Sequence, residues 1–486
     1  MRLWPFGLAL TGVLGAGAAA LGLQYITQSS APVGFRAWMA SRAGAEPSAA
    51  FGETGRAYRE RGNRSTDFGP AGASAARSIA ALCYDREGHP VPNDDPGDAA
   101  CRTIASTQFI DSVERFAAVL KTAQPGTAYE ILPGTYRMKG NGYYVLPVGR
   151  ADAPIILRAA RLGDVRLEFD MTEGFAVQAP YWVFENLDIR GVCESDSACE
   201  HAFHLSRDAR ATVIRNNRIS DFNAQVKINA APDNSSVPDD VLIDHNNFID
   251  SRPRKTGYPV TKVDSVRASR LNVVGNVIAD FAKEGSDQRS YAAFSKGGGT
   301  GNRFERNLVI CEWMHKGGQR IGLSLGGGGT ADRYCVGGSC KVEDRGGIIR
   351  SNVVVGCNDV GIYLRRAENA RIERNMLIAT RGIDARFNTT SALISGNIFD
   401  GRLMTWSGAT ATSEANVSSP WRAALLKPVT NTLFAAPLRG NFSPVGRFPA
   451  APVDAGVRDF CGTIFGPNSA AGPFSSACAP DIPALR

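Results

Sequence analysis

Polar and basic side chains recur at equivalent places in a series of short apolar segments. Segments such as His201-Ala-Phe-His-Leu205 and Gln225-Val-Lys-Ile-Asn229 alternate in polarity, so one set of side chains faces inward and the other outward. The outward set that we predict is His204, Lys227, Asn229, Arg267, Ser295, Ser324, Tyr363, Arg365, Asp384 and Arg386, with Lys296 just past its strand. This set is mostly basic. It could bind a long polymer with many negative charges and move a proton beside one of the polymer's carboxylates.

An internal repeat predicts the elements that position these side chains. An apolar run, two variable residues and an Asn recur, ending at Asn186, Asn216, Asn246, Asn276, Asn307, Asn352, Asn375 and Asn397, at intervals of 30, 30, 30, 31, 45, 23 and 22 residues. Strand-length runs at such intervals, without a helical period, predict an all-β fold: a single-stranded right-handed parallel β-helix, or solenoid. Asn suits the corners because it tolerates the left-handed conformation and because stacked amides can bond from coil to coil. A β-sandwich would have shorter and less constant spacings.

The inward set should form the core of this solenoid. It comprises Phe203, Leu205, Val226, Ile228, Val266, Phe294, Leu323, Leu325, Ile362, Leu364 and Ile383. The interval of 45 residues holds an insertion with four glycines, Gly326 to Gly329, and two cysteines. We expect this insertion to overhang the outward set as a wall.

Composition is that of a soluble protein with a large core. The chain has 486 residues, of which 43% are hydrophobic and 21% charged, and this excludes collagen-like, coiled-coil and wholly disordered chains. The formal charge of +7 is only mildly basic, so the clustering of cations indicates the partner better than the total does.

Four regions follow from the pattern along the chain. Residues 1–28 form a signal peptide or membrane anchor, because no charged residue separates Arg2 from Arg36 and the segment is apolar. Residues 29–105 are a linker and N-terminal cap region, residues 106–403 the β-helix, and residues 404–486 an irregular C-terminal capping tail. The protein is therefore expected in the periplasm or outside the cell, and at the inner membrane if the first segment is not cleaved.

The ten cysteines can form five disulfides between residues that are close in the sequence or in successive coils. The pairs are Cys83 with Cys101, Cys193 with Cys199, Cys311 with Cys357, Cys335 with Cys340, and Cys461 with Cys478. Cys311 and Cys357 follow the Asn corners of successive coils by four and five residues, which places them side by side. Zinc is the competing interpretation, but no paired metal-ligand spacing supports it.

Among acidic polymers, a polysaccharide fits better than nucleic acid. The outward set has little aromatic interleaving beyond Tyr363, no nucleic-acid motif is recognised, and the chain is predicted to be exported. We therefore expect a monomer that binds an acidic polysaccharide and no nucleic acid, with membrane contact only through an uncleaved first segment.

Several segments resemble the coils of chondroitinase B and of alginate lyases in polysaccharide lyase family six. They are Ile131-Leu-Pro-Gly-Thr-Tyr-Arg, Ala153-Pro-Ile-Ile-Leu-Arg-Ala, Trp182-Val-Phe-Glu-Asn-Leu-Asp-Ile-Arg-Gly, Asp244-His-Asn-Asn-Phe and Ser295-Lys-Gly-Gly-Gly-Thr-Gly-Asn-Arg-Phe-Glu-Arg-Asn, within residues 126–403. The resemblance implies β-elimination on uronate chains by a Lys base, an assisting Arg and a calcium ion held by acidic residues. Lys296 stands where that Lys would be. Arg289 and Tyr291 stand at the positions of Glu calcium ligands, and Gly326 stands near that of the assisting Arg, so the calcium site is not matched.

The chemistry can also be argued from the residues. A Lys of ordinary pKa, about 10.4, is a poor base unless burial or like charges lower that pKa. Lys227 and Arg267 could do so for Lys296, Arg289 could hold the carboxylate in place of calcium, and Tyr291 or Tyr363 could return the proton. The predicted catalytic residues are Lys296, Arg289, Tyr291 and Arg267. The predicted substrate-binding residues are Lys227, Asn229, His204, Ser324, Tyr363, Arg365 and Arg386.

Two other functions remain open at this stage. One is a non-catalytic glycan-binding protein of the envelope, which the missing calcium ligands favour. The other is a glycoside hydrolase that uses two carboxylates from among Asp264, Asp384 and Glu284. Simpler roles are also open for single residues: Lys296 as a solvated corner residue, His204 as a surface imidazole, and Asp384 paired only with Arg386.

Overall fold

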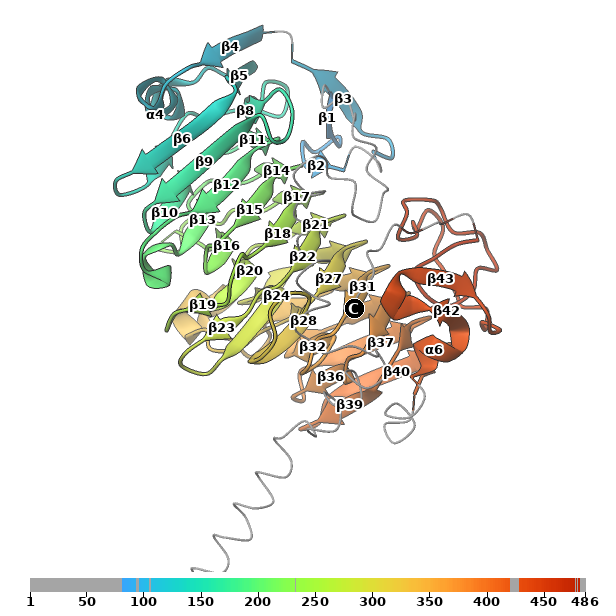
Figure 1. Cartoon of the computed structure of the whole chain (residues 1–486). Coiled ribbons are helices and arrows are strands. Elements are labelled where there is room, and N and C mark those ends of the chain that lie inside the picture. The colour runs from blue at the N-terminus through green and yellow to red at the C-terminus, as the bar shows by residue number, and fades with distance from the viewer. Residues whose placement is uncertain are drawn as a thin grey trace, which may run out of the picture. The chain divides into compact units, whose positions relative to one another are not determined.

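Three long parallel sheets organise the protein. The computed structural model describes residues 81–92, 96–104, 106–231, 233–419, 428–476, 478 and 480. The chain passes from a twelve-stranded to an eleven-stranded to a ten-stranded sheet and then begins the next coil (Figure 1). This is the predicted parallel β-helix. The predicted signal or anchor segment lies outside the described residues, among which no helix is both long enough and apolar enough to cross a membrane.

Each coil contributes one strand to each long sheet. The twelve-stranded sheet contains β4 (Ser106–Ile110), β5 (Thr127–Ile131), β8 (Ile155–Ala159), β11 (Trp182–Glu185), β14 (Val213–Arg215), β17 (Leu242–Asp244), β21 (Asn272–Val274), β26 (Arg303–Glu305), β30 (Ile348–Arg350), β34 (Ala370–Glu373), β37 (Ser391–Ser395) and β40 (Thr410–Glu414). The eleven-stranded sheet contains β6 (Gly134–Lys139), β9 (Val165–Asp170), β12 (Asp188–Gly191), β15 (Arg218–Ser220), β18 (Asn247–Ile249), β22 (Val277–Ala279), β27 (Leu308–Ile310), β31 (Val353–Val355), β35 (Met376–Ile378), β38 (Ile398–Phe399) and β41 (Val417–Ser418). The ten-stranded sheet contains β7 (Tyr143–Val145), β10 (Glu173–Val177), β13 (His201–Leu205), β16 (Ala224–Ile228), β20 (Val260–Val266), β24 (Arg289–Lys296), β28 (Gln319–Leu325), β32 (Ile362–Arg365), β36 (Gly382–Arg386) and β39 (Arg402–Trp406).

Short elements complete the described structure. Small sheets are formed by β1 (Ala81–Tyr84), β2 (Pro90–Val91) and β3 (Ala100–Thr103); by β19 (Arg254–Lys255) and β23 (Lys283–Glu284); by β25 (Gly299–Thr300), β29 (Asp344–Arg345) and β33 (Ala367–Glu368); and by β42 (Phe434–Ala436) and β43 (Asn441–Pro444). The helices are α4 (Val113–Thr122), α6 (Val429–Leu433) and the 3-10 turns η1 (Asp196–Ala198), η2 (Asp332–Tyr334), η3 (Val336–Gly338) and η4 (Pro437–Arg439).

Side chains on alternate strand positions fill the inside of the solenoid. Phe203 stacks on Phe175 of the preceding coil with ring centres 4.9 Å apart, and Val226 pairs in register with Val263 of the next coil. Burying such apolar columns stabilises the fold by roughly 2 kcal/mol for each large side chain. At the first coil, α4 buries Phe116, Val119 and Leu120 against this core.

A ladder of Asn side chains joins the coils. Its members are Asn217, Asn246, Asn276, Asn307, Asn352, Asn375, Asn397 and Asn416, and each amide nitrogen donates to the next amide oxygen at 2.9 to 3.0 Å. The residue before each ladder Asn takes the left-handed conformation, for example His245 at φ 53°. The sequence motif was therefore one residue out of register at Asn186 and Asn216, which are themselves the left-handed residues. Asn therefore recurs because its side-chain amide bonds to the next coil, and the residue before it is the one that takes the left-handed backbone conformation.

The solenoid ends later than predicted. Strands β39 to β41 extend it past Leu403, and Asn416 continues the Asn ladder. Beyond it, part of the tail packs along the side of the coils, because the Arg374 guanidinium donates to the Ala451 and Ala470 carbonyls at 2.6 Å. Arg374 is 1% exposed, so the tail buries it.

All five predicted disulfides are present in the structure. Cys311 and Cys357 join successive coils with their Cα atoms 4.9 Å apart, as the coil register required. No described cysteine is free.

Candidate active site

Side chains from ten coils form one column on the outer face of the ten-stranded sheet. In register order they are Tyr144, Ala176, His204, Lys227, Asp264, Phe294, Ser324, Tyr363, Asp384 and Met404. Residues more than 250 positions apart in the chain therefore share one face. Five residues of the predicted outward set lie in this column: His204, Lys227, Ser324, Tyr363 and Asp384.

The face is less basic than the sequence suggested, because carboxylates pair with its cations. The ion pairs are Lys227 with Asp264 at 2.8 Å, Arg365 with Glu343 at 2.5 Å and Arg386 with Asp384 at 2.7 Å, and the Nδ1 of His204 lies 2.6 Å from a Glu173 carboxylate oxygen. Glu173 and Glu343 had not been predicted to act here. Alternating charges of this kind can fix cations in place without creating a strong net field.

Lys296 lies at the centre of this arrangement, at the end of β24. Its Nζ donates to the Gly328 carbonyl at 3.2 Å and lies 4.5 Å from the centre of the Phe294 ring. Burial lowers the pKa of Lys296; the positive charges of Lys227 and Arg365 add to this effect, and the carboxylate of Asp264 opposes it. The predicted influence of Lys227 on this amine is therefore present.

A glycine-rich segment covers Lys296. The Glu343 carboxylate accepts hydrogen bonds from the backbone nitrogens of Gly327 and Gly328 at 2.9 and 2.8 Å and also pairs with Arg365. Gly328 has a φ of 75°, and a Cβ there would collide with the Arg365 guanidinium. Glycine at position 328 thus lets the backbone pass close to the Arg365 guanidinium while its carbonyl accepts from Lys296, and the insertion overhangs the sheet as predicted.

The prediction that Phe294 faces inward and Ser295 outward is wrong. Phe294 lies in the outer column, between Asp264 and Ser324, and is buried there by the glycine-rich segment. Ser295 is inside, where its hydroxyl donates to Asp344 Oδ2 at 2.7 Å. An apolar side chain can face outward when another segment covers it, and the two-residue alternation alone cannot reveal that cover.

Val266 was also misplaced. It pairs in register with Lys296 on the outer side, whereas Val263 is the core residue of that strand.

The predicted catalytic residues do not all meet. Arg289 is exposed at the other end of β24, up to about 23 Å from Lys296 if the strand is fully extended, and it donates to Gln319 at 3.3 Å. Arg267 follows β20 with a φ of 76° and lies close enough to Asp239 to favour the ionised carboxylate. The Arg267 backbone nitrogen donates to the Lys296 carbonyl at 2.7 Å. The positive charges that lower the pKa of the Lys296 amine most are those of Lys227 and Arg365.

Tyr291 lies nearer. Its ring packs edge-on against Phe294 with ring centres 5.3 Å apart, and burial raises its pKa to about 12. Burial also raises the pKa of Tyr363, which joins Tyr291 in one apolar cluster with Ile321, Val360 and Met404. Both phenols stay protonated at neutral pH.

The remaining predicted binding residues fall into three settings. His204 bridges Glu173 and Asn229, with its Nε2 2.7 Å from the Asn229 oxygen. Arg386 lies over the Tyr363 ring at 5.7 Å. Ser324 is fully buried and bonded to the Gly326 carbonyl, so a ligand on the face cannot reach it.

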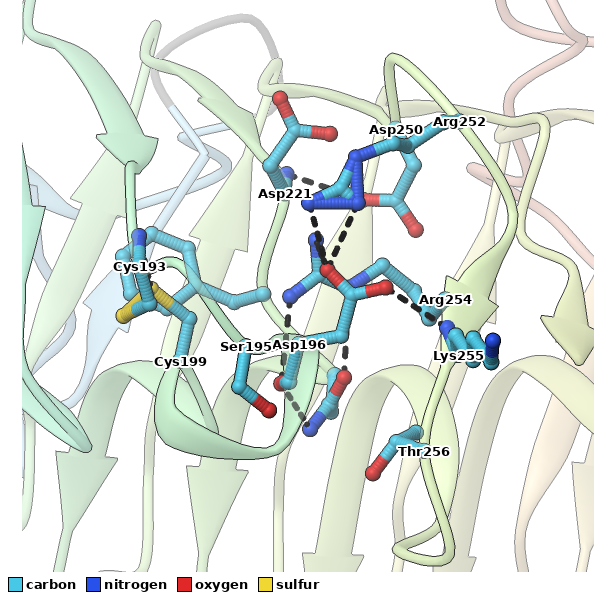
Figure 2. A network of polar contacts seen from close by, with 12 residues as sticks. Cys193, Ser195, Asp196, Cys199, Asp221, Asp250, Arg252, Arg254, Lys255 and Thr256 are labelled. Atoms are coloured by element: carbon cyan, nitrogen blue, oxygen red, sulfur yellow. Dashed lines mark hydrogen bonds and ion pairs between the residues drawn. A yellow bond between two sulfur atoms is a disulfide. The ribbon is translucent and has the colours of Figure 1, made fainter. Parts of the chain in front are cut away.

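A polar network fixes the segments that lead into β13 and β20 (Figure 2). The disulfide of Cys193 and Cys199 closes a short loop that carries Asp196. The Asp196 carboxylate is buried and accepts from Arg252 at 2.8 Å and from the Lys255 backbone at 2.7 Å, and it lies 3.0 Å from the Arg254 guanidinium. This network had not been predicted, because its partners lie 56 to 59 residues apart.

Calcium does not fit the residues at the positions implied by the resemblance. Arg289 offers a guanidinium and Tyr291 a protonated phenol, whereas calcium requires several oxygen ligands, mainly carboxylates and carbonyls. In the described part of the chain, the groups of three side chains with ligand atoms close enough for a metal lie elsewhere: Asp85 with Glu87 and His89, and Asp459 with Cys461 and Cys478. Both cysteines of the second group are in a disulfide.

Comparisons with known proteins identify similar solved structures. An alginate lyase from Paenibacillus is 15% identical, with a TM-score of 0.38 over 65% of this chain and 96% of that one. A rhamnogalacturonan lyase is also 15% identical, with a TM-score of 0.39 over 75% of this chain and 96% of that one. Pectate lyase Pel9A is 15% identical, with a TM-score of 0.34 over 78% of this chain and 90% of that one. No protein-family model and no curated protein sequence matched. At these identities and TM-scores the likeness carries no argument about activity, and the fold rests on the strand pairings above.

Proposed function

We propose that the protein is a polysaccharide lyase that cleaves an acidic, uronate-containing polysaccharide by β-elimination on the outer face of the ten-stranded sheet. The observation that carries the proposal is the position of the Lys296 amine on the outer side of the sheet, where it donates to the Gly328 carbonyl at 3.2 Å. Burial lowers the pKa of this amine; Lys227 and Arg365 add to the effect, and the Asp264 and Glu343 carboxylates oppose it. A neutral amine is a competent base for a proton next to a carboxylate.

The surrounding cations suit the charge that this step creates. Removing the proton beside the uronate carboxylate leaves negative charge on that carboxylate, which needs donors fixed in advance. Arg365 and Lys227 are held by Glu343 and Asp264, and both influence Lys296 electrostatically. We assign them to the substrate carboxylate. Arg365, from a later coil, thus takes the role that the sequence suggested for Arg289, which lies at the other end of β24 from Lys296.

The second proton transfer falls to a tyrosine. Elimination moves the proton from carbon to Lys296 Nζ, forms the carbon–carbon double bond and breaks the bond to the leaving oxygen, which then needs a proton. Tyr291 and Tyr363 are protonated phenols in the cluster beside Phe294. Either can donate to that oxygen, and Lys296 can later restore the phenol through solvent.

The carboxylates considered for a hydrolase do not form a pair. Asp264 and Asp384 lie four strand spacings apart in the same column, about 19 Å at the usual spacing. Facing carboxylates in glycosidases are roughly 5 to 9.5 Å apart. Glu284 is exposed on β23, outside the ten-stranded sheet.

Export is part of the proposal. Five disulfides suit an oxidising compartment, which points to the periplasm or the outside of the cell. The test of function is incubation of the purified protein with alginate, chondroitin, pectate and bacterial exopolysaccharides, followed by ultraviolet absorbance of unsaturated products. A rise with one polymer supports the lyase. Tight binding without any rise would support a glycan-binding protein instead.

A further inference from the structure

Exposed aromatic side chains stand at both ends of the ten-stranded sheet. Tyr144 lies on β7, the first strand, and is 46% exposed; Trp406 lies on β39, the last strand, and is 49% exposed. Nothing in the proposed elimination uses either residue. A single exposed aromatic residue is common on protein surfaces, so what points to a ligand is where these two residues lie relative to the candidate site.

Register ties both residues to the candidate active site. Tyr144 heads the column that continues through Ala176 to His204 and Lys227. Trp406 ends a parallel column two residues further along the strands, which runs from Arg365 through Arg386. Both aromatic residues therefore face the same side as the proposed base.

The distal end also carries a prepared cation. Arg386 is the register partner of Trp406, and its guanidinium lies 5.7 Å from the centre of the Tyr363 ring. Two hydrogen bonds that it donates to Asp384 Oδ2, at 2.9 and 2.7 Å, hold the guanidinium in place. Its side chain remains 48% exposed. A guanidinium held beside an aromatic ring matches a sugar that bears both an apolar ring face and a carboxylate.

We propose that Trp406 with Arg386 and Tyr144 form two terminal subsites on which the sugar rings of a long acidic polysaccharide stack, on either side of the central Lys296 site. This inference rests on the proposed function and extends it to the length of the ligand. The ten strands span about 43 Å at the usual spacing, so only a chain of many sugars reaches both ends. Short oligosaccharides would bind at the centre alone.

The test compares chain lengths. The polymer that the wild-type protein cleaves in the absorbance assay is titrated calorimetrically against Lys296→Met protein, which prevents turnover, and a tetrasaccharide of the same polymer is titrated in parallel. Trp406→Ala and Tyr144→Ala are added singly to this background. Phe109→Ala is the matched control, because Phe109 is 54% exposed on β4 of the twelve-stranded sheet.

The inference predicts that Trp406→Ala and Tyr144→Ala each weaken polymer binding by about tenfold and leave tetrasaccharide binding unchanged, with no effect of Phe109→Ala. Equal polymer affinity in all variants would overturn the terminal subsites while leaving the lyase intact. Equal losses for tetrasaccharide and polymer would also overturn them, since the aromatic residues would then act at the centre. If the wild-type protein neither cleaves nor binds any polymer of the panel, the proposed function itself fails.

Discussion

Lys296 Nζ lies 4.5 Å from the centre of the Phe294 ring, and both side chains project from β24 on the outer side of the sheet. The ring, together with Gly327 and Gly328, removes water from most of the lysine side chain. This loss of water lowers the pKa of Lys296, whereas the aromatic face and the Gly328 carbonyl each favour the protonated amine.

Replacement of Lys296 should abolish turnover and leave the fold intact. We expect Lys296→Met and Lys296→Arg to lower kcat by roughly 100- to 10,000-fold, because neither side chain can accept the proton at neutral pH. Circular dichroism and the melting temperature should change little. Lys121→Met, on the exposed face of α4, is the matched control and should keep full activity.

The pH profile should report the lowered pKa of Lys296. Activity needs the neutral amine, so kcat/KM should rise with pH and level off below the pH expected for an ordinary lysine. Lys227→Met removes a nearby positive charge and frees the Asp264 carboxylate, and both changes favour the protonated amine. The rising limb should therefore move to higher pH in this variant. A shift to lower pH would contradict the assignment.

Acid should destabilise the fold through His201. Burial, with the charges of His204 and Lys227, lowers the pKa of His201 to about 4, compared with 6.5 when the chain is unfolded. Between these values the unfolded state binds the extra proton, so stability should fall by up to about 3 kcal/mol as the pH drops from 6.5 to 4. Urea unfolding of His201→Gln should show a shallower decline over this range. From pH 7 to 8, the free energy of unfolding should depend on pH in the same way in the wild-type and His201→Gln proteins.

Loss of one rung should weaken the Asn ladder. Asn276 donates to Asn307 and accepts from the side chain of Asn246, both at 3.0 Å, and it is fully buried. Asn276→Ala leaves these partners unsatisfied, so the free energy of unfolding should fall by about 3 kcal/mol. The exposed Asn388→Ala should cost less than about 0.5 kcal/mol in the same denaturation assay. An equal loss of unfolding free energy in Asn276→Ala and Asn388→Ala would show that the Asn ladder does not stabilise the fold.

The solenoid was predictable because its repeat is local and periodic. Apolar runs at regular intervals predicted the strands, and the coil register predicted the disulfide between Cys311 and Cys357. The Asn motif was less certain in its register, since Asn216 and Asn217 are adjacent and only the hydrogen bonds show which one belongs to the ladder.

The candidate site was predictable only in part. Alternation placed Lys227 and Tyr363 on the outer face, but it could not show that Glu343 would return from an insertion to hold Arg365, or that glycines would bury Phe294. Such contacts depend on where a loop folds back, and a loop without a repeat carries no sequence signal for that. Arg267 lies at a left-handed corner, where strand alternation has ended, so the alternation could not predict the direction of its side chain.

Proton NMR of the digestion products tests the elimination at Lys296 most directly. With the polymer that the wild-type protein degrades, the account predicts the vinyl proton of an unsaturated uronate at the new chain end, and its absence from a digest by Lys296→Met protein. New reducing ends without a vinyl proton, or a vinyl proton formed equally by the Lys296→Met protein, would contradict it.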